Sequence, residues 1–188
     1  MPILPKILEK TITAKSRFFT IEALHLEFAN GVKRIYERLI GGRSGAVMVI
    51  PVTDDGQLLF VREYAVATER YELSFPKGVV DSGETTEQAA NRELQEEVGF
   101  AAGQLVMLKE LTVAPSYFCG SMQIFVAQNL VASQLLGDEP EPLLVGSVPI
   151  NQSLELIKCP EFSEARTIAA LYLFLQWWQQ QDGSCVNS

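Results

Sequence analysis

The stretch GVVDSGETTEQAANRELQEEVGF, residues 78–100, decides how the rest of the chain is interpreted. It places three glutamates, Glu93, Glu96 and Glu97, at spacings that lie on one face of a helix. In water, such like-charged neighbours destabilise a helix by only ~0.2–0.5 kcal/mol per pair. In a partly dry pocket with an effective dielectric constant of ~20, two charges ~5.5 Å apart repel by ~3 kcal/mol. The glutamates therefore form either a solvated acidic surface or a pocket that needs a cation.

The same stretch contains the signals that begin and end a helix. Thr85 and Gln88 have the spacing of a capping box, and Gly99 stands where a glycine commonly ends a helix. Between them an apolar residue recurs at every fourth position: Ala90, Leu94 and Val98. This apolar stripe predicts a helix that packs on a sheet. Because the three glutamates lie off the stripe, we expect the helix to display them beside the loop that precedes it.

Strand patterns flank this helix on both sides. Before it, residues 46–52 and 57–64 are predicted to form a hairpin around the turn TDDG, and residues 71–76 a further strand. After it, the pattern predicts strands at 104–114, 122–131 and 143–150, loops at 115–121 and 137–142, and helices at 151–158 and 163–181. Strands this apolar need cover on both faces. The predicted fold class is α+β, an α/β/α sandwich with a mixed β-sheet.

The N-terminal residues form a separate segment. Residues 1–40 have strand-like composition, with a hairpin signal at Asn30-Gly31. Residues 41–45, GGRSG, have the composition of a hinge. We therefore predict an N-terminal β-strand segment over residues 1–44, one main domain over 45–183, and a disordered tail over 184–188.

Composition restricts the partners of the chain. The net charge is −8 and no basic stripe is visible, so we expect no nucleic-acid partner. The apolar run at 168–178 is too short to span a bilayer and the N-terminus lacks an export signal, so we expect no membrane association. Cys119, Cys159 and Cys185 form no CxxC pair, which favours a reducing, cytoplasmic location.

From Gly78 the chain continues with five residues to Glu84, seven to Arg92-Glu93-Leu94, one to Glu96-Glu97, and one to Gly99-Phe100. In this spacing the chain resembles the Nudix hydrolases at every fixed position of their signature. The segments VREYAV, YELSFPKG, APSYF, GDEPEP and EARTIAAL are similar to the branch that hydrolyses ADP-linked compounds. The resemblance implies a Nudix fold and an Mg²⁺-dependent hydrolase that cleaves the pyrophosphate linkage of ADP-ribose, NADH or diadenosine triphosphate and releases AMP. A strict ADP-ribose pyrophosphatase and a non-catalytic nucleotide-sensing module are the alternatives.

A metal site agrees with the chemistry of this reaction. Mg²⁺ prefers hard oxygen ligands, polarises phosphoryl oxygens and lowers the pKa of a bound water molecule. By resemblance, Glu93 and Glu97 are the principal metal ligands, and the backbone carbonyl of Lys77 is a further one. Glu96 is either a ligand of an additional ion or a supporting carboxylate. The resemblance implies two or three Mg²⁺ ions per site, which Mn²⁺ can replace.

The remaining signature residues have roles of position and orientation. Arg92 resembles the arginine that orients a glutamate in the reaction, and its alternative is a surface ion pair with Glu96. Glu84 ties the loop to the helix, or alternatively serves as a ligand or base, as in some relatives. Gly78 and Gly99 are structural positions.

The general base is expected in a loop outside the signature. In ADP-ribose pyrophosphatases a mobile loop after the sheet provides the base, and an acidic residue two positions later reaches the metal. Glu139 and Glu141 have this spacing in the loop 137–142. By resemblance Glu139 is the base and Glu141 the metal-reaching carboxylate. An ordinary acidic loop stiffened by prolines is the alternative.

The substrate residues depart from the relatives' pattern. Many ADP-ribose pyrophosphatases carry an Arg-Gln-Tyr-Arg motif, whereas residues 62–65 are Arg-Glu-Tyr-Ala, without the second arginine. We expect Arg62 to pair with a substrate phosphate or with Glu72. Ser116 and Tyr117 stand where relatives have a glycine-rich loop that holds the terminal ribose, so the aromatic ring either stacks on the substrate or packs in the core.

A homodimer is the expected assembly. Relatives exchange N-terminal strands between subunits and build the site across the interface. Arg38 is a candidate to reach the nucleotide of the partner, and an exposed edge charge is the alternative interpretation. The expected ligand is a small nucleotide.

Overall fold

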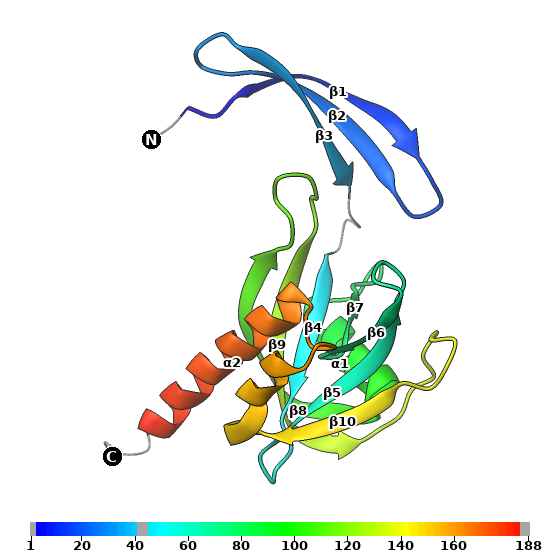
Figure 1. The fold of residues 1–188 in the computed structure, drawn as a ribbon, viewed down its shortest axis with the longest axis vertical. Helices are drawn as coiled ribbons and strands as arrows, with labels where there is room; N and C mark the ends of the chain where they lie inside the picture. The colour runs from blue at the N-terminus through cyan, green and yellow to red at the C-terminus, as the bar shows by residue number, and fades with distance from the viewer. Residues whose placement is uncertain (1–2, 41–44, 185–188) are drawn as a thin grey trace. The chain divides into compact units, whose positions relative to one another are not determined.

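The computed structural model describes residues 3–40 and 45–184, with side chains described up to residue 181 (Figure 1). The predicted hinge, apart from Gly45, and the predicted tail, apart from the backbone of Ser184, lie outside these residues. The chain divides into two compact units. One consists of Met1–Gly45 and Thr112–Ser121, and the other of Ala46–Leu111 and Met122–Ser188.

The first unit is built on an antiparallel three-stranded sheet in the order β1-β2-β3. Its strands are β1 (Lys6–Lys15), β2 (Thr20–Glu27) and β3 (Lys33–Ile40). The turn between β2 and β3 falls at Asn30-Gly31, as the hairpin signal predicts. Gly31 has φ +80°, a conformation that glycine adopts without strain. The segment Thr112–Ser121 joins this sheet through backbone bonds from Leu39 N–H to the Tyr117 carbonyl and from Cys119 N–H to the Leu39 carbonyl.

The second unit contains two sheets. One has the order β7-β4-β9-β8, from β7 (Lys77–Val79), β4 (Ala46–Pro51), β9 (Ser121–Ala132) and β8 (Phe100–Thr112). The other has the order β10-β5-β6, from β10 (Leu144–Pro149), β5 (Gln57–Ala65) and β6 (Arg70–Ser74). β4 runs parallel to β9 and antiparallel to β7, so the sheet is mixed, as predicted.

Two helices cover opposite faces of the central strands β4 and β9. They are α1 (Thr86–Glu97) and α2 (Ala165–Ser184), and a 3-10 helix, η1 (Ile150–Lys158), precedes α2 (Figure 1). Alternate residues of β4 face opposite ways: Val47 and Val49 pack with α1, and Met48 and Ile50 with α2. This confirms the predicted α/β/α sandwich and explains why the strand is apolar at every position. No helix in the described part of the chain is long and apolar enough to cross a membrane.

The structure corrects the predicted hairpin of residues 46–64. Its turn is present, with a hydrogen bond from Thr53 N–H to the Gln57 carbonyl (3.0 Å) and Gly56 at φ +76°. The two strands then separate, because β4 is paired on both edges by β7 and β9 while β5 pairs with β6 and β10. Only an isolated bridge, Val52 with Leu58, joins them. The three-residue strand β7 is too short and too rich in glycine to be recognised from its pattern.

Candidate active site

The helix α1 is fixed at its start and along one face. The Thr85 hydroxyl accepts a hydrogen bond from Gln88 N–H (3.2 Å), and the Gln88 side-chain oxygen accepts one from Thr85 N–H (2.8 Å), so the predicted capping box is present. Ala90 and Leu94 are fully buried against the sheet. The packing of this face turns the signature glutamates toward β7 and the loop 134–143.

These elements enclose a pocket of about 880 Å³. It is lined by residues 77–79 of β7, by Arg92 and the three glutamates of α1, and by residues 134–143 between β9 and β10. The structure thus brings Glu139 and Glu141, about 40 residues away in sequence, to the same pocket as the signature glutamates. The helix glutamates and the acidic loop 137–142 therefore form one site, although they are far apart in the sequence.

Gly78 allows β7 and α1 to approach closely. A Cβ atom at this position would lie 1.9 Å from Oε1 of Glu93, far inside van der Waals contact. The backbone of β7 therefore leaves the space that the Glu93 carboxylate occupies. Position 78 favours glycine because a larger residue would collide with the Glu93 carboxylate.

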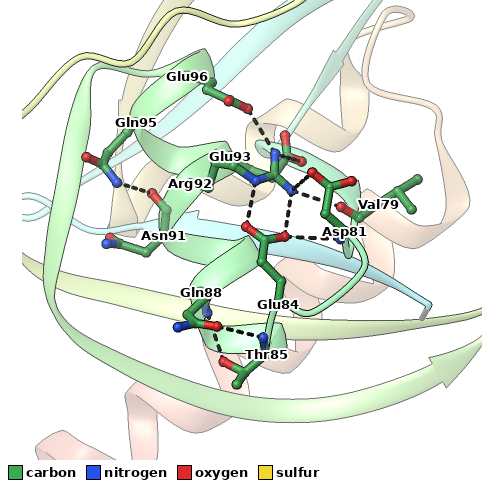
Figure 2. A network of polar contacts seen from close by, with 10 residues as sticks. All are labelled: Val79, Asp81, Glu84, Thr85, Gln88, Asn91, Arg92, Glu93, Gln95 and Glu96. Carbon is green, nitrogen blue, oxygen red and sulfur yellow. Dashed lines mark hydrogen bonds and ion pairs between the residues drawn. The ribbon is translucent and has the colours of Figure 1, made fainter.

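Arg92 is the centre of an ion-pair network (Figure 2). Its guanidinium donates to both oxygens of Glu84 (2.8 and 3.0 Å), to Oε1 of Glu93 (2.7 Å) and to Oε2 of Glu96 (3.0 Å). A further bond goes to the carbonyl of Val79 (3.0 Å). Arg92 therefore pairs with Glu96 and contacts Glu93 at the same time, and its role in orienting a glutamate stays a prediction. Its hydrogen bonds hold the pKa of Glu84 below its usual value and join the loop 79–84 to the helix.

Glu97 is partly buried in the pocket, beside Glu93, which is the more buried residue as a whole. The Oε2 atom of Glu97 is buried and has no hydrogen-bond partner. Burial raises its pKa to about 8, and the negative charges of Glu93 and Glu63 add to this effect, while Lys77 opposes it. Burial also raises the pKa of Glu93, against the effect of Arg92. A buried carboxylate oxygen without a partner is unfavourable unless a proton or a cation compensates it.

The donor set suits a divalent cation in its chemistry, although the side chains have not converged on one point. Within residues 3–40 and 45–184, no three His, Cys, Asp or Glu side chains are arranged to hold a metal ion. Arg92 occupies one oxygen of Glu93 and one of Glu96, as Figure 2 shows. The buried Oε2 atom of Glu97 has no hydrogen-bond partner, and a bound cation would satisfy it. Hard carboxylate oxygens are the ligands that Mg²⁺ prefers.

The side chain of Lys77 lines the pocket and is bonded to Glu63, and neither side chain was predicted to have a role. Lys77 Nζ donates to Glu63 Oε2 (2.5 Å) and to Ser74 Oγ (3.1 Å). From the sequence, a role was expected only for the backbone carbonyl of Lys77. Alternation along β5 offers a signal, because Leu59 and Val61 pack on the α1 side of the sheet and residue 63 continues that face.

The two glutamates of the loop 137–142, Glu139 and Glu141, differ in their surroundings. Burial raises the pKa of Glu139, as do the charges of Glu63 and Asp138, and Lys77 opposes them. Glu141 accepts a hydrogen bond from the Tyr71 hydroxyl at its Oε1 atom (2.6 Å). The charges of Glu63, Asp138 and Lys77 therefore act on Glu139, whereas a hydrogen bond to β6 holds Glu141.

The predicted substrate residues of the second unit lie outside the pocket wall. Arg62 faces away from Glu63 along β5 and makes a two-point ion pair with Glu161 (3.0 and 2.9 Å). It does not pair with Glu72, which accepts bonds from Arg70 (2.8 Å) and Ser163 (3.1 Å). Antiparallel pairing with β6 leaves this arginine on the face opposite the signature glutamates.

The remaining predicted substrate residues lie in the first unit. Arg38 makes a two-point ion pair with Glu22 (2.9 and 2.6 Å) across β2 and β3. Arg38 and Ser116 line a smaller pocket of about 440 Å³ within this unit. Tyr117 is exposed, so its ring does not pack in a core.

Comparison with known proteins agrees with this geometry. Residues 42–165 match the model of the NUDIX domain, and residues 5–38 match that of the NudE-type Nudix hydrolase N-terminal domain. The chain is 50% identical to the ADP compounds hydrolase NudE of Escherichia coli (strain K12), over 94% of this chain and 95% of that protein. It is 31% identical to an ADP-ribose pyrophosphatase of Bacillus subtilis (strain 168), over 91% and 96% of the two chains.

A solved structure agrees in fold. The crystal structure of an ADP compounds hydrolase superposes with a TM-score of 0.92 at 49% identity, over 96% of this chain and 97% of that one. The box from Gly78 to Phe100, the sandwich around β4 and the pocket beside α1 all fall within the matched region. The chain therefore belongs to the Nudix hydrolase family and is a pyrophosphohydrolase.

Proposed function

We propose that this enzyme hydrolyses the pyrophosphate linkage of ADP-linked small molecules, namely ADP-ribose, NADH and diadenosine triphosphate, and releases AMP. The observation that carries the proposal is the buried Oε2 atom of Glu97, which has no hydrogen-bond partner, beside Glu93 in a pocket that also contains Glu139. The similarity to the ADP compounds hydrolase of E. coli supports the substrate class.

Nudix hydrolases generally need a divalent metal such as Mg²⁺. In this chain Glu93 and Glu97 are proposed to hold it, with the Lys77 carbonyl and Glu96 as further ligands of two or three ions, and with Mn²⁺ as a substitute. A bound divalent ion polarises phosphoryl oxygens and neutralises their charge. Arg92, released from part of its pairing with Glu93 and Glu96, keeps its bonds to Glu84 and orients the helix glutamates.

Glu139 is proposed to accept the proton of the attacking water molecule. As the water oxygen bonds to phosphorus, the proton passes to this carboxylate, and the bond to the leaving phosphate oxygen breaks. A raised pKa suits this role, since a stronger base takes a proton more readily. Glu141, which keeps one oxygen free of Tyr71, is proposed as the loop carboxylate that reaches the metal.

Several substrates are proposed because the chain lacks one determinant of strict selectivity. Ala65 stands where many ADP-ribose pyrophosphatases have a second arginine. The exposed Tyr117, beside Ser116, offers a ring on which different terminal groups can stack. A strict ADP-ribose pyrophosphatase would process ADP-ribose alone.

A cytoplasmic homodimer is the proposed state of the enzyme. The strand register places Ile7, Ile12 and Tyr36 on one face of the first sheet, and their side chains are 48%, 55% and 49% exposed. Exposed apolar side chains on a three-stranded sheet are stabilised when a second surface covers them. In such a dimer Arg38 is a candidate to reach the partner's nucleotide.

The direct test is product formation. Purified protein is incubated with each of the three substrates in Mg²⁺ and in excess EDTA, and AMP is measured by chromatography. We expect AMP in Mg²⁺ from all three compounds and none in EDTA. Absence of AMP from every compound in Mg²⁺ contradicts the proposal, and nucleotide binding without turnover would indicate the sensing module instead.

A further inference from the structure

The loop 137–142 is held at its two ends by neighbouring elements. On the upstream side, Ser133 Oγ donates to Gln95 Oε1 (2.8 Å) and Gln134 Nε2 donates to the Glu96 carbonyl (3.1 Å). On the downstream side, β10 begins its pairing with β5 at residue 144. The loop 137–142 lies between these attachments and carries three acidic residues, Asp138, Glu139 and Glu141.

A single hydrogen bond holds the loop between its ends. Among the described residues, the bond from the Tyr71 hydroxyl to Glu141 Oε1 (2.6 Å) is the only one made by residues 137–142. Tyr71 belongs to β6, on a different part of the unit from α1. The loop is therefore attached to the β5–β6 pair through one side chain.

Tyr71 is itself held rigidly. The Arg62 guanidinium lies 4.5 Å from the centre of its ring, and Arg62 is fixed by its two-point ion pair with Glu161. The ring of Tyr64, its partner in the β5–β6 register, contacts it edge-on at 5.7 Å between ring centres. These contacts restrict the direction in which the hydroxyl points.

The sequence of the loop transmits this attachment to Glu139. Glu139 precedes Pro140, and Glu141 precedes Pro142. A residue before proline is restricted to extended conformations, and proline itself has a nearly fixed φ. The segment 139–142 is therefore stiff, so fixing the carboxylate at position 141 also fixes the position of the one at 139.

Charge makes such an attachment necessary. Asp138 and Glu63 are negative charges that act on Glu139, and the glutamates of α1 line the same pocket. Their repulsion favours an open loop, and within the pocket only Lys77 and Arg92 oppose it as cations among the described lining residues.

We propose that Tyr71 is a positioning residue, whose hydroxyl holds Glu141 and through it keeps Glu139 in the pocket. The proposal rests on the function proposed above for Glu139. One hydrogen bond is enough to hold the loop because Arg62 fixes the Tyr71 ring and the two prolines stiffen the loop.

The first test measures the mobility of the loop without requiring activity. Tyr71→Phe removes the hydroxyl and keeps the ring, and Tyr64→Phe is the matched control, because no hydrogen bond of its hydroxyl is found in the described structure. Backbone ¹⁵N relaxation is measured on the metal-free full chain at residues 138, 139 and 141. We expect order parameters near about 0.8 in the wild type and in Tyr64→Phe, and below about 0.6 in Tyr71→Phe.

The second test asks whether the effect passes through Glu139. Losing a hydrogen bond to a charged group corresponds to a fall in kcat of about tenfold for Tyr71→Phe, with a smaller change in KM and none in Tyr64→Phe. In a Glu139→Gln background, Tyr71→Phe should cause no further loss, because the group that it positions is already disabled. If Tyr71 had a purely structural role, Tyr71→Phe would lower kcat by the same factor in the wild-type and Glu139→Gln backgrounds.

The outcomes separate this proposal from the proposed function. Unchanged order parameters in Tyr71→Phe, an unchanged kcat, or a loss that persists in Glu139→Gln overturns the role of Tyr71. If the wild type releases no AMP from any ADP-linked compound, the proposed function fails, and the relaxation measurement alone decides whether Tyr71 holds the loop.

Discussion

Glu97 has the least favourable surroundings of the pocket's carboxylates, with a buried oxygen that no donor satisfies. Replacement by glutamine keeps its size and removes the negative charge that a divalent ion needs. We expect Glu97→Gln to lower kcat by about 10³-fold, measured as AMP release in Mg²⁺. Glu87→Gln is the matched control, since residue 87 is an exposed glutamate in the first turn of the same helix and outside the pocket. Activity close to that of the control would contradict the assigned role.

The same residue predicts a pH dependence of stability in the metal-free protein. The pKa of Glu97 is about 8 in the folded chain against an ordinary value of 4.5. The folded state therefore binds a proton that the unfolded state releases, so this contribution to the free energy of unfolding is complete below pH 4.5 and is lost as the pH rises to about 8.

Urea denaturation in EDTA checks this dependence. Between about pH 5 and about pH 8 the wild type should lose stability relative to Glu97→Gln, which has no titrating group at this position. Parallel pH curves for the two proteins would show that Glu97 is not buried as a carboxylic acid.

At the scale of elements, the pocket depends on the close approach of β7 and α1 at Gly78. A methyl group at this position would meet the Glu93 carboxylate at 1.9 Å. We expect Gly78→Ala to displace that carboxylate and weaken Mg²⁺ binding by about tenfold or more, measured by calorimetric titration. Circular dichroism should show that the helix is retained, because the caps and the apolar face of α1 are untouched. Wild-type affinity for Mg²⁺ in this variant would mean that Glu93 is not a ligand.

The elements themselves were largely predictable from local patterns. The capping box of α1, its apolar stripe and the turn at Asn30-Gly31 depend on residues close in sequence, and each is present in the structure. The error in the hairpin of β4 and β5 has a different origin. Both strands are apolar and joined by a good turn, yet which edges they pair with is decided by β7, β9 and β10, which are distant in the chain.

The site shows the same limit. The spacing of the signature glutamates indicated that they share a helix face, and burial of Glu97 could not be read from that spacing. The contact between Glu63 on β5 and the Lys77 side chain on β7 depends on tertiary structure and could not be predicted from the sequence. Arg62 was expected to pair with a substrate phosphate or with Glu72, whereas the fold brings it to Glu161, 99 positions away. Long-range ion pairs depend on tertiary packing and leave no local pattern.

At the scale of the whole molecule, the exposed apolar side chains on one face of the β1-β2-β3 sheet predict self-association. Ile12 is 55% exposed on this face. A lysine here would place a charge in a surface that a second copy is proposed to cover, and burying an unpaired charge is strongly unfavourable. Sedimentation equilibrium should therefore give twice the mass of one chain for the wild type and a shift toward a single chain for Ile12→Lys.

The control for this prediction adds the same charge elsewhere. Gln104→Lys alters an exposed position of β8 in the second unit and should leave the mass unchanged. If Ile12→Lys retains the mass of the wild type, this face is not the interface, whereas a monomeric wild type would remove the proposed dimer altogether. Should the dimer dissociate while AMP release per chain is preserved, Arg38 of a partner is not needed for turnover, and the pocket beside α1 is complete within one chain.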